Sequence, residues 1–550
     1  MQVIDKNTPL PNGLIVVNAF GFGGANAMVI LRPYKERRQV TNSLSHRLVH
    51  VSGRTEQGLE LMLETIIKNK NNKQLLSLID SIYHKPIDNH NHRGYAVLSK
   101  DSHYHINQSS SKRRPIWFLY AGFGSQWPGM AKDMMKIDIF RNTIRKCAEA
   151  LKPYGIDLED VVVNGTEETF NDLSKTFPAI TAVSVALTDV LVAMNIKPNG
   201  IIGHSLGEVG KFTYSTQLII KVALTLILGC AYADGLITPE EAVLLSYSRG
   251  YAAVSAELIP GAMAAIGLPA EECSKILPEG VYIACENSDD NVTISGPREV
   301  IKDFLESLST RGVFYRLINN ANYALHCPHL APAGQKMYEI AKKALPGVKP
   351  RTKRWLSSAF HENEWNTEIA RHNSAEYHYH NYMHKVHFGQ VLKYIPKDAI
   401  VIEVAPRGLL QGILKRALDQ SVMLISLLKP GVDNIDFFLS SVGNYYNNGG
   451  QLDLSNFYKP VKFPVSIDTP MLASLVKWDH RVKWHGLRYN AGSSFGSRVD
   501  IDMYEKENHF LEGHIADGRI ILPASGYIVS QKLKLYESQN SSSKSHFHFL

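Results

Sequence analysis

The sequence predicts a multidomain α/β protein, and three observations carry this prediction. The chain has 550 residues, more than one hydrophobic core usually holds, since domains commonly run to roughly 100 to 200 residues. From residue 115 onward, strand, glycine-turn and helix patterns alternate, which is typical of a parallel sheet covered by helices. Over residues 263–319, the order β-α-β-β-α-β predicts a ferredoxin-like subdomain inserted in the larger unit.

Composition excludes several classes of protein. A hydrophobic fraction of 44% with 20% charged residues indicates a folded chain that is neither disordered nor membrane-embedded. The net charge of +7 is spread along the chain rather than gathered in a basic stripe, so no nucleic-acid partner is expected. The five cysteines show no CxxC spacing, which argues against a disulfide framework or a zinc site and favours a reducing, cytoplasmic location.

No targeting or membrane segment is expected. Residues 1–11 are polar and lack the apolar core of a signal peptide. The apolar run 218–229 is interrupted by Lys221 and falls short of the roughly 20 residues that a membrane span needs.

The N-terminal third predicts two small units. Strands 14–17 and 29–31 flank a glycine-dense turn, and because two strands are not stable alone, residues 1–35 are expected to belong to something larger. Residues 36–112 predict a small α/β domain with strand 50–52, helix 56–70, helix 73–83 and strand 95–98. The Ser-, Lys- and His-rich stretch 99–114 is interpreted as a boundary.

Residues 113–415 predict the main unit. Its expected elements are strands 116–120, 200–203 and 399–404 and helices 138–151, 178–194 and 332–344, with the ferredoxin-like insert at 263–319. A proline-spotted linker is expected over 416–475, and a last unit over 476–550.

The motif Gly203-His204-Ser205-Leu206-Gly207 fits G-x-S-x-G after a strand and before a helix. Small flanking residues allow a strained turn that exposes the Ser205 hydroxyl, and the Leu206 N–H then points at a developing oxyanion. A second oxyanion donor is expected from the turn Gly122–Gln126. A functionless serine turn and a plain strand-to-helix connection are the structural alternatives.

A serine hydroxyl needs a general base to become a nucleophile. His326, which follows the ferredoxin-like insert, is the candidate, although one of 22 histidines falling there by chance is the alternative.

Other histidines suggest weaker hypotheses. His514 lies in H-x-x-x-G-x-x-x-x-P, where a structural histidine is the usual explanation. Five histidines between residues 372 and 387 suggest a metal site, but a solvated loop is favoured and no metal is expected. These histidines are His372, His378, His380, His384 and His387.

Taken in order, these motifs resemble animal type I fatty acid synthase along nearly the whole chain. The matching segments are 18–33, 49–98, 117–130, 203–209, 231–235, 287–297, 355–358, 374–377, 477–480 and 514–527. The resemblance implies a ketosynthase C-terminal remnant (1–35), a linker domain (36–112), a malonyl/acetyl acyltransferase of α/β-hydrolase-like fold (113–415), a post-acyltransferase linker (416–475) and the start of a hotdog-type dehydratase (476–550). A highly reducing polyketide synthase shares this domain order and is the nearest rival, and a catalytically inactive structural fragment is a further alternative.

The resemblance also implies roles. Ser205 would be the acyl-carrying nucleophile, His326 its base, and the N–H groups of Leu206 and Gln126 the oxyanion hole. Arg249 would pair with the free carboxylate of malonyl, for which a planar guanidinium is suited; the alternative is a surface cation at a helix end. His514 would belong to an incomplete dehydratase site.

The same resemblance implies substrates and partners. Coenzyme A thioesters would be substrates, no cofactor would be bound in this part, and NADPH would serve the full-length synthase. Partners would be the phosphopantetheine of an acyl carrier protein and the rest of the synthase, homodimeric at full length.

Three positions depart from the family pattern. Met28 stands where the ketosynthase has a catalytic histidine, and a thioether cannot transfer a proton. The carboxylate expected beside His514 would lie beyond Leu550. Leu325 replaces an aromatic residue of malonyl-selective relatives, which leaves the acyl selectivity open.

Residues 211–229 are predicted to be a translated intron. Without them, Gly210 joins Cys230 and the family's elbow helix continues without a gap. Gly210-Lys211-Phe212 can be encoded with a GTAAGT donor, and Leu228-Gly229 with an acceptor AG in the same phase. A lineage-specific surface insertion is the alternative.

Overall fold

The computed structural model describes residues 13–21, 24, 26–34, 45–108, 113–203, 226–318, 321–345, 347–476, 504 and 506–522. The chain divides into two units, which are described separately. The larger holds residues 39–465 and 469–476, and the smaller holds residues 1–38, 466–468 and 477–550.

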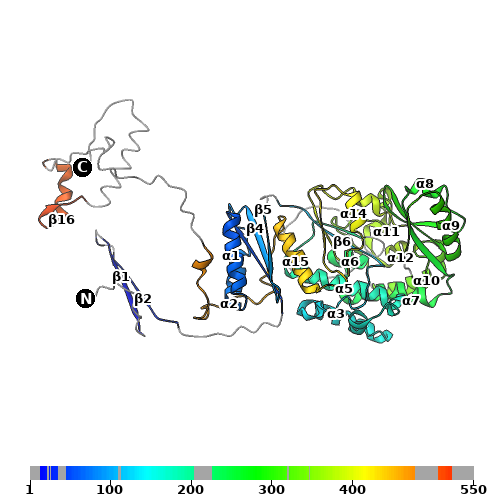
Figure 1. The fold of residues 1–550 in the computed structure, drawn as a ribbon, viewed down its shortest axis with the longest axis horizontal. Helices are drawn as coiled ribbons and strands as arrows, with labels where there is room; N and C mark the ends of the chain where they lie inside the picture. The colour runs from blue at the N-terminus through cyan, green and yellow to red at the C-terminus, as the bar shows by residue number, and fades with distance from the viewer. Residues whose placement is uncertain are drawn as a thin grey trace, which may run out of the picture. The chain divides into compact units, whose positions relative to one another are not determined.

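A four-stranded parallel sheet lies at the centre of the larger unit (Figure 1). Its strands are β6 (Ile116–Tyr120), β7 (Gly200–Gly203), β14 (Ile400–Glu403) and β15 (Met423–Ser426), in the spatial order β15-β14-β6-β7. The observed strands confirm those predicted at 116–120, 200–203 and 399–404. Their near-continuous apolar runs are typical of strands that are buried on both faces. The fourth strand, β15, lies in the segment 416–475, for which the sequence predicts a linker.

Helix α5 (Leu173–Ala193) is the longest helix of the core and packs against α3 (Asp138–Leu151) and α7 (Pro239–Ser255). It begins five residues before the predicted start at Pro178, because the Asp172 side chain caps it by accepting the Ser174 N–H. A helix that is apolar on all sides belongs in a core. Among the described residues, α5 alone has the length and apolarity to cross a membrane, and most of it is buried inside the unit.

Shorter helices complete this part of the unit, and the helices predicted at 138–151 and 332–344 are confirmed. The remaining helices are α4 (Leu158–Asn164), α6 (Leu226–Ala233), α10 (Ala331–Ala344), α11 (Glu368–Arg371), α12 (Ala375–Met383), α13 (Phe388–Leu392) and α14 (Gln411–Ala417).

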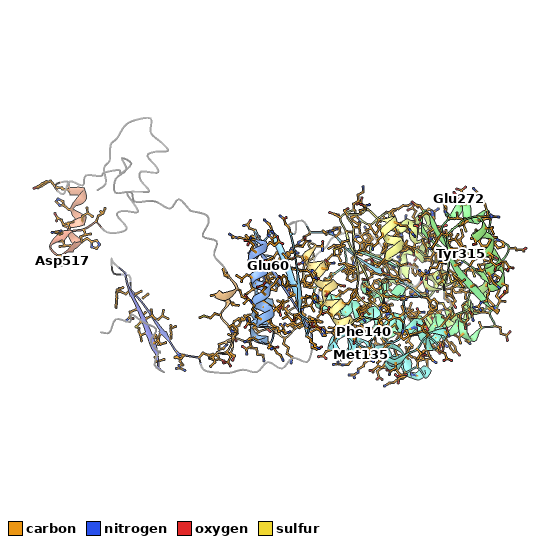
Figure 2. The ribbon with its side chains drawn as sticks, viewed as in Figure 1. Glu60, Met135, Phe140, Glu272, Tyr315 and Asp517 are labelled. Atoms are coloured by element: carbon orange, nitrogen blue, oxygen red, sulfur yellow. The ribbon has the colours of Figure 1, made fainter. Side chains whose placement is uncertain are left out.

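The predicted ferredoxin-like subdomain is confirmed. Its elements are β8 (Gly261–Ile266), α8 (Ala270–Ser274), β9 (Tyr282–Ser288), β10 (Asn291–Pro297), α9 (Arg298–Thr310) and β11 (Tyr315–Ile318). The antiparallel strand order β11-β8-β10-β9 is that of the predicted β-α-β-β-α-β motif. The subdomain has its own apolar core, and Figure 2 labels Glu272 on α8 and Tyr315 on β11.

A three-stranded antiparallel sheet precedes the parallel sheet in the chain. It consists of β3 (Arg47–Gly53), β4 (His92–Leu98) and β5 (His103–Gln108), with helices α1 (Glu56–Lys68) and α2 (Lys73–Tyr83) between β3 and β4. Both helices and the first two strands are confirmed. The boundary predicted over residues 99–114 is wrong for 103–108, because these residues pair with β4 as the third strand.

The two faces of this sheet meet different partners, since successive strand residues point to opposite faces. Val49 and Val51 pack with α1 and α2, whereas Leu48 belongs to the main core. Helix α15 (Asn434–Asn447) lies beside β4 and β5 in Figure 1 and contacts both strands. At Gly443 of α15, an added Cβ would lie 2.3 Å from the Tyr95 ring, so only glycine allows this approach.

The smaller unit contains two short hairpins among its described residues. β1 (Ile15–Phe20) pairs antiparallel with β2 (Asn26–Leu31), which confirms the two N-terminal strands. β16 (Ile515–Ala516) pairs with β17 (Arg519–Ile520) after the 3₁₀ turn Lys506–Gly513. The predicted start of the last unit near Trp478 lies outside the described residues.

Candidate active site

Two strands of the parallel sheet lead into segments that carry predicted catalytic residues, and a third strand ends beside them in the sheet at Glu403. β6 runs into the turn that contains Gln126, β7 ends at Gly203, and β14 ends at Glu403. Parallel strands end at one edge of a sheet, which is where α/β proteins commonly bind ligands. The Ser358 hydroxyl donates to the Gly203 carbonyl oxygen at 3.2 Å. Ser205 and Leu206 follow Gly203 in a segment outside the described residues.

The turn after β6 holds Gln126 in a defined position. Gly124 has a φ of +99°, a conformation that favours glycine. The Gln126 Oε1 accepts the Gly124 N–H at 2.8 Å, and the Ser125 hydroxyl donates to the Gly122 carbonyl at 3.0 Å. Within the described parts of the chain, the Gln126 N–H donates to no acceptor. An amide in this state can stabilise an oxyanion.

His326 lies 6% exposed behind β11, and a backbone carbonyl orients it. Its Nδ1 is 3.2 Å from the carbonyl oxygen of His384. Because a carbonyl only accepts hydrogen bonds, Nδ1 carries a proton, and in the neutral imidazole Nε2 is then the nitrogen with the lone pair. The φ of 56° at His326 is costly for a residue with a side chain, and such strain clusters at functional sites. These features are those of a general base.

The carbonyl that orients His326 belongs to a segment anchored on the ferredoxin-like subdomain. Glu286 of β9 accepts the Lys385 ammonium at 2.6 Å and lies 3.0 Å from Nδ1 of His387. The His387 hydrogen bond, aided by Lys385, lowers the pKa of Glu286 to about 2. Two backbone hydrogen bonds, from Glu286 N to Val386 O and from Val386 N to Ala284 O, join the same segments. The subdomain therefore helps fix the residues that follow His384.

Arg249 of α7 is only 1% exposed, which excludes the surface-cation alternative. Its Nη1 donates to the Asn381 Oδ1 and its Nη2 to the His378 carbonyl, both at 3.0 Å. The Tyr382 hydroxyl donates to the Arg249 carbonyl at 3.2 Å. A buried guanidinium needs such partners, because desolvating a charge is costly. Helix α12 thus holds Arg249 in one orientation.

The solvated loop predicted for the histidine-rich stretch is wrong. Residues 375–383 form α12, which begins at the N-cap Ser374, whose hydroxyl accepts the Tyr377 N–H. His378 is fully buried, and burial, with Arg249 nearby, holds its pKa well below the usual range. His380 stacks between Phe360 and His384, with ring centroids 4.0 and 4.2 Å apart. Among the described residues, no group of three His, Cys, Asp or Glu side chains could hold a metal ion.

Two predicted positions lie in the smaller unit. His514 is half-buried, its N–H donates to the Leu511 carbonyl at 3.0 Å, and its carbonyl accepts the Ile521 N–H at 2.9 Å. These bonds close the turn around the β16–β17 hairpin. Met28 lies on β2, opposite Asn18, with an exposed side chain.

The sequence-based reasoning missed Glu403 and the loop 404–410. Glu403 is fully buried at the end of β14, and its carboxylate accepts three hydrogen bonds. A lone carboxylate in an otherwise apolar buried strand is a signal that was present in the sequence. Asn381 was missed for another reason, because its contact with Arg249 joins residues 132 positions apart.

Comparison with protein families assigns this fold. The model of the acyl transferase domain matches residues 117–451. The chain belongs to the acyl transferase domain family. Residues 1–97 of this acyltransferase chain also match the ketoacyl-synthetase C-terminal extension.

Curated relatives indicate the class of synthase. The acyltransferase chain is 26% identical to the highly reducing polyketide synthase srdA of Neurospora crassa, over 96% of this chain and 25% of the relative. It is 25% identical to the highly reducing polyketide synthase anuA of Penicillium roqueforti, over 83% of this chain and 23% of the relative. The chain thus spans about a quarter of these relatives. They are fungal polyketide synthases, the rival named above, and not animal fatty acid synthases.

Solved structures agree on the fold of the acyltransferase. The acyl transferase domain of ZmaA matches with a TM-score of 0.61 at 19% identity, over 78% of this chain and all of that domain. The acyltransferase domain from module 8 of the salinomycin polyketide synthase matches with a TM-score of 0.58 at 20% identity, over 75% of this chain and 98% of that domain.

Proposed function

We propose that this acyltransferase serves a type I synthase of the highly reducing polyketide class. It transfers malonyl or acetyl groups from coenzyme A to Ser205 and then to the phosphopantetheine thiol of an acyl carrier protein. The fungal relatives favour polyketide over fatty acid synthesis. The acyl-transfer step itself is the same in both classes, so the choice between them concerns the product and not this chemistry.

The observation that carries the proposal is the state of His326. A buried imidazole whose Nδ1 faces a carbonyl presents Nε2 as a proton acceptor. The carbonyl that orients His326 belongs to His384, and Glu286 anchors the residues that directly follow it, Lys385 and His387. The serine motif follows β7 at the sheet edge where such a base is needed.

The proposed reaction has two balanced steps. The Ser205 oxygen attacks the thioester carbon while its proton passes to Nε2 of His326. The oxyanion that forms accepts hydrogen bonds from the N–H groups of Leu206 and Gln126. The carbon–sulfur bond then breaks, and the imidazolium returns the proton to the departing coenzyme A thiolate. In the second step, the carrier thiol attacks the acyl-serine carbon while its proton passes to Nε2 of His326. The carbon–oxygen bond to Ser205 then breaks, and the imidazolium returns that proton to the serine oxygen.

Acylation of the purified chain tests the proposal. After incubation with malonyl-CoA or acetyl-CoA, we expect intact-mass and peptide mass spectrometry to locate one acyl group on Ser205. Ser205→Ala should abolish the label, whereas Ser255→Ala, at an exposed position on α7, should retain it. A label on another residue would overturn the assignment of Ser205, and a folded chain that takes up no label would support the inactive structural fragment instead.

A further inference from the structure

The loop 404–410, which follows β14, contacts the turn that carries Gln126. The Trp127 Nε1 donates to the Pro406 carbonyl oxygen at 2.7 Å. The Arg407 Nη2 donates to the Gly124 carbonyl oxygen. These bonds bracket Gln126 on both sides in the sequence, and both come from the same loop.

Glu403 fixes the shape of this loop. Its Oε1 accepts the N–H groups of Leu409 and Leu410 at 2.7 and 2.9 Å, and its Oε2 accepts the Gln411 side-chain amide at 2.7 Å. Buried polar groups are almost always hydrogen-bonded, and the partners of the Glu403 carboxylate are residues at the end of this loop. The carboxylate therefore ties residues 404–410 into a closed turn.

Leu409 of the same loop lies close to Gly124. A Cβ built on Gly124 would lie 3.6 Å from Cδ2 of Leu409, which is ordinary van der Waals contact. The Leu409 side chain therefore lies near the turn residue whose carbonyl accepts the Arg407 hydrogen bond.

The turn 122–127 is not part of a helix or strand, so no ladder of backbone bonds sets the direction of the Gln126 amide. The Gln126 side chain bonds back to Gly124 N, which orients the side chain but leaves the amide direction to the flanking residues. An oxyanion donor must be aimed to within a narrow range before the reaction begins.

We propose that Arg407 and Trp127 are positioning residues, which fix the Gln126 amide through their bonds to the turn and to loop 404–410. The inference rests on the proposed acyl transfer, because the Gln126 N–H acts only where an oxyanion forms. Neither side chain needs to contact the substrate. Loss of either bond leaves the acyl-CoA site intact and lowers only the stabilisation of the transition state.

Single-turnover acylation by malonyl-CoA tests this proposal. The variants are Trp127→Phe, which removes the indole N–H donor together with the five-membered ring but keeps a six-membered aromatic ring, and Arg407→Ala. Each variant should acylate Ser205 at least about 10-fold more slowly, because removing one oxyanion-hole donor outright costs about 100- to 1000-fold. The half-saturating malonyl-CoA concentration should stay within about 2-fold, because ground-state binding is unchanged.

Matched variants separate positioning from general damage. Arg407→Lys keeps a donor and should recover part of the rate. Arg416→Ala, at an exposed position on α14, should match the parent. The double variant Trp127→Phe with Arg407→Ala should be slowed by less than the product of the two single effects, since both act on one turn.

The outcomes discriminate between the two hypotheses. A parent chain that does not acylate Ser205 overturns the proposed function. A parent that acylates, with variants that keep its rate or lose only substrate affinity, overturns the positioning role alone. If Arg407→Ala melts near the assay temperature, its rate is not used. The acylation rate of Trp127→Phe, measured well below the melting temperatures of that variant and the parent, then tests the positioning role.

Discussion

Arg249 illustrates how the fold fixes the orientation of one long side chain. Its guanidinium is buried, and two of its donors are taken up by Asn381 and the His378 carbonyl on α12. Holding a long, flexible side chain in place in advance removes much of the entropy that binding would otherwise cost. A carboxylate that arrives at this position meets a fixed cation.

The selectivity of Arg249 can be tested directly. Arg249→Ala should raise the barrier for malonyl transfer by about 2 to 4 kcal/mol, because a buried charge-assisted pair is lost. Acetyl transfer should be spared, since acetyl has no free carboxylate. Acylation rates with the two coenzyme A thioesters check this. Equal losses for both substrates would show that Arg249 only holds α7 against α12.

At the scale of elements, helix α6 bears on the predicted intron. An added Cβ at Gly229 would lie 2.3 Å from the Tyr120 ring, so this position of the helix accepts only glycine. Excision of residues 211–229 would put Gly210 directly before Cys230, in the place that Gly229 holds. The excised chain would therefore keep glycine at the one position of α6 where β6 requires it.

We predict that the chain without residues 211–229 is more stable and more active than the chain as written. The excised chain joins the end of β7 to α6 through the elbow residues alone, and loops closed by fewer residues cost less entropy. Thermal melting and Ser205 acylation of both chains check this, and transcript sequencing shows whether the segment is removed. A mature message that keeps the segment, with undiminished activity of its product, would establish a surface insertion instead.

Sequence patterns were sufficient for elements with a strong period. The short strand pattern at 50–52 and the apolar run 116–120 predicted strands, and the order of elements in 263–319 predicted the ferredoxin-like subdomain. The pattern failed for β5, since His103 and His105 lie on an edge strand that is only partly buried. It also failed for α12, where burial of His378 against Arg249 stabilises a helix that histidine and tyrosine do not favour by themselves.

The sequence predicted only those residues of the candidate site that lie in short motifs. His326, Arg249 and Gln126 stand in motifs that are local in sequence. Loop 404–410 and Asn381 act through contacts between residues far apart in the chain, and no local pattern reports such contacts.

At the scale of the larger unit, His50 links the N-terminal sheet to the main core. It is fully buried on β3, its Nε2 lies 3.1 Å from the Tyr83 carbonyl, and its ring meets the Tyr446 ring of α15 edge-on at 4.8 Å. Burial lowers the pKa of His50 to about 4. The folded chain therefore keeps this imidazole neutral where the unfolded chain takes up a proton.

His50 should make folding sensitive to mild acid. Because its folded pKa lies below the unfolded value of about 6.5, its contribution is present above pH 6.5 and is lost as the pH falls through about 4. His50→Gln keeps a donor for the Tyr83 carbonyl but does not titrate. Between pH 7 and pH 4, the free energy of unfolding, measured in urea, should fall by on the order of 3 kcal/mol less in this variant than in the parent. The exposed variant His84→Gln should follow the parent, and an unchanged pH profile for His50→Gln would refute the assignment.

The packing of α15 on the N-terminal sheet also affects how the chain folds during synthesis. The Tyr458 hydroxyl accepts the Leu48 N–H at 2.8 Å, across 410 residues of sequence. Synthesis at roughly 5 to 20 residues per second leaves β3 and β4 without α15 for on the order of half a minute. During that interval, the face that carries Leu48 and Tyr95 is open to other nascent chains. Contacts so distant in sequence form late, so this apolar face is buried only after the acyltransferase that follows it in the chain has been made.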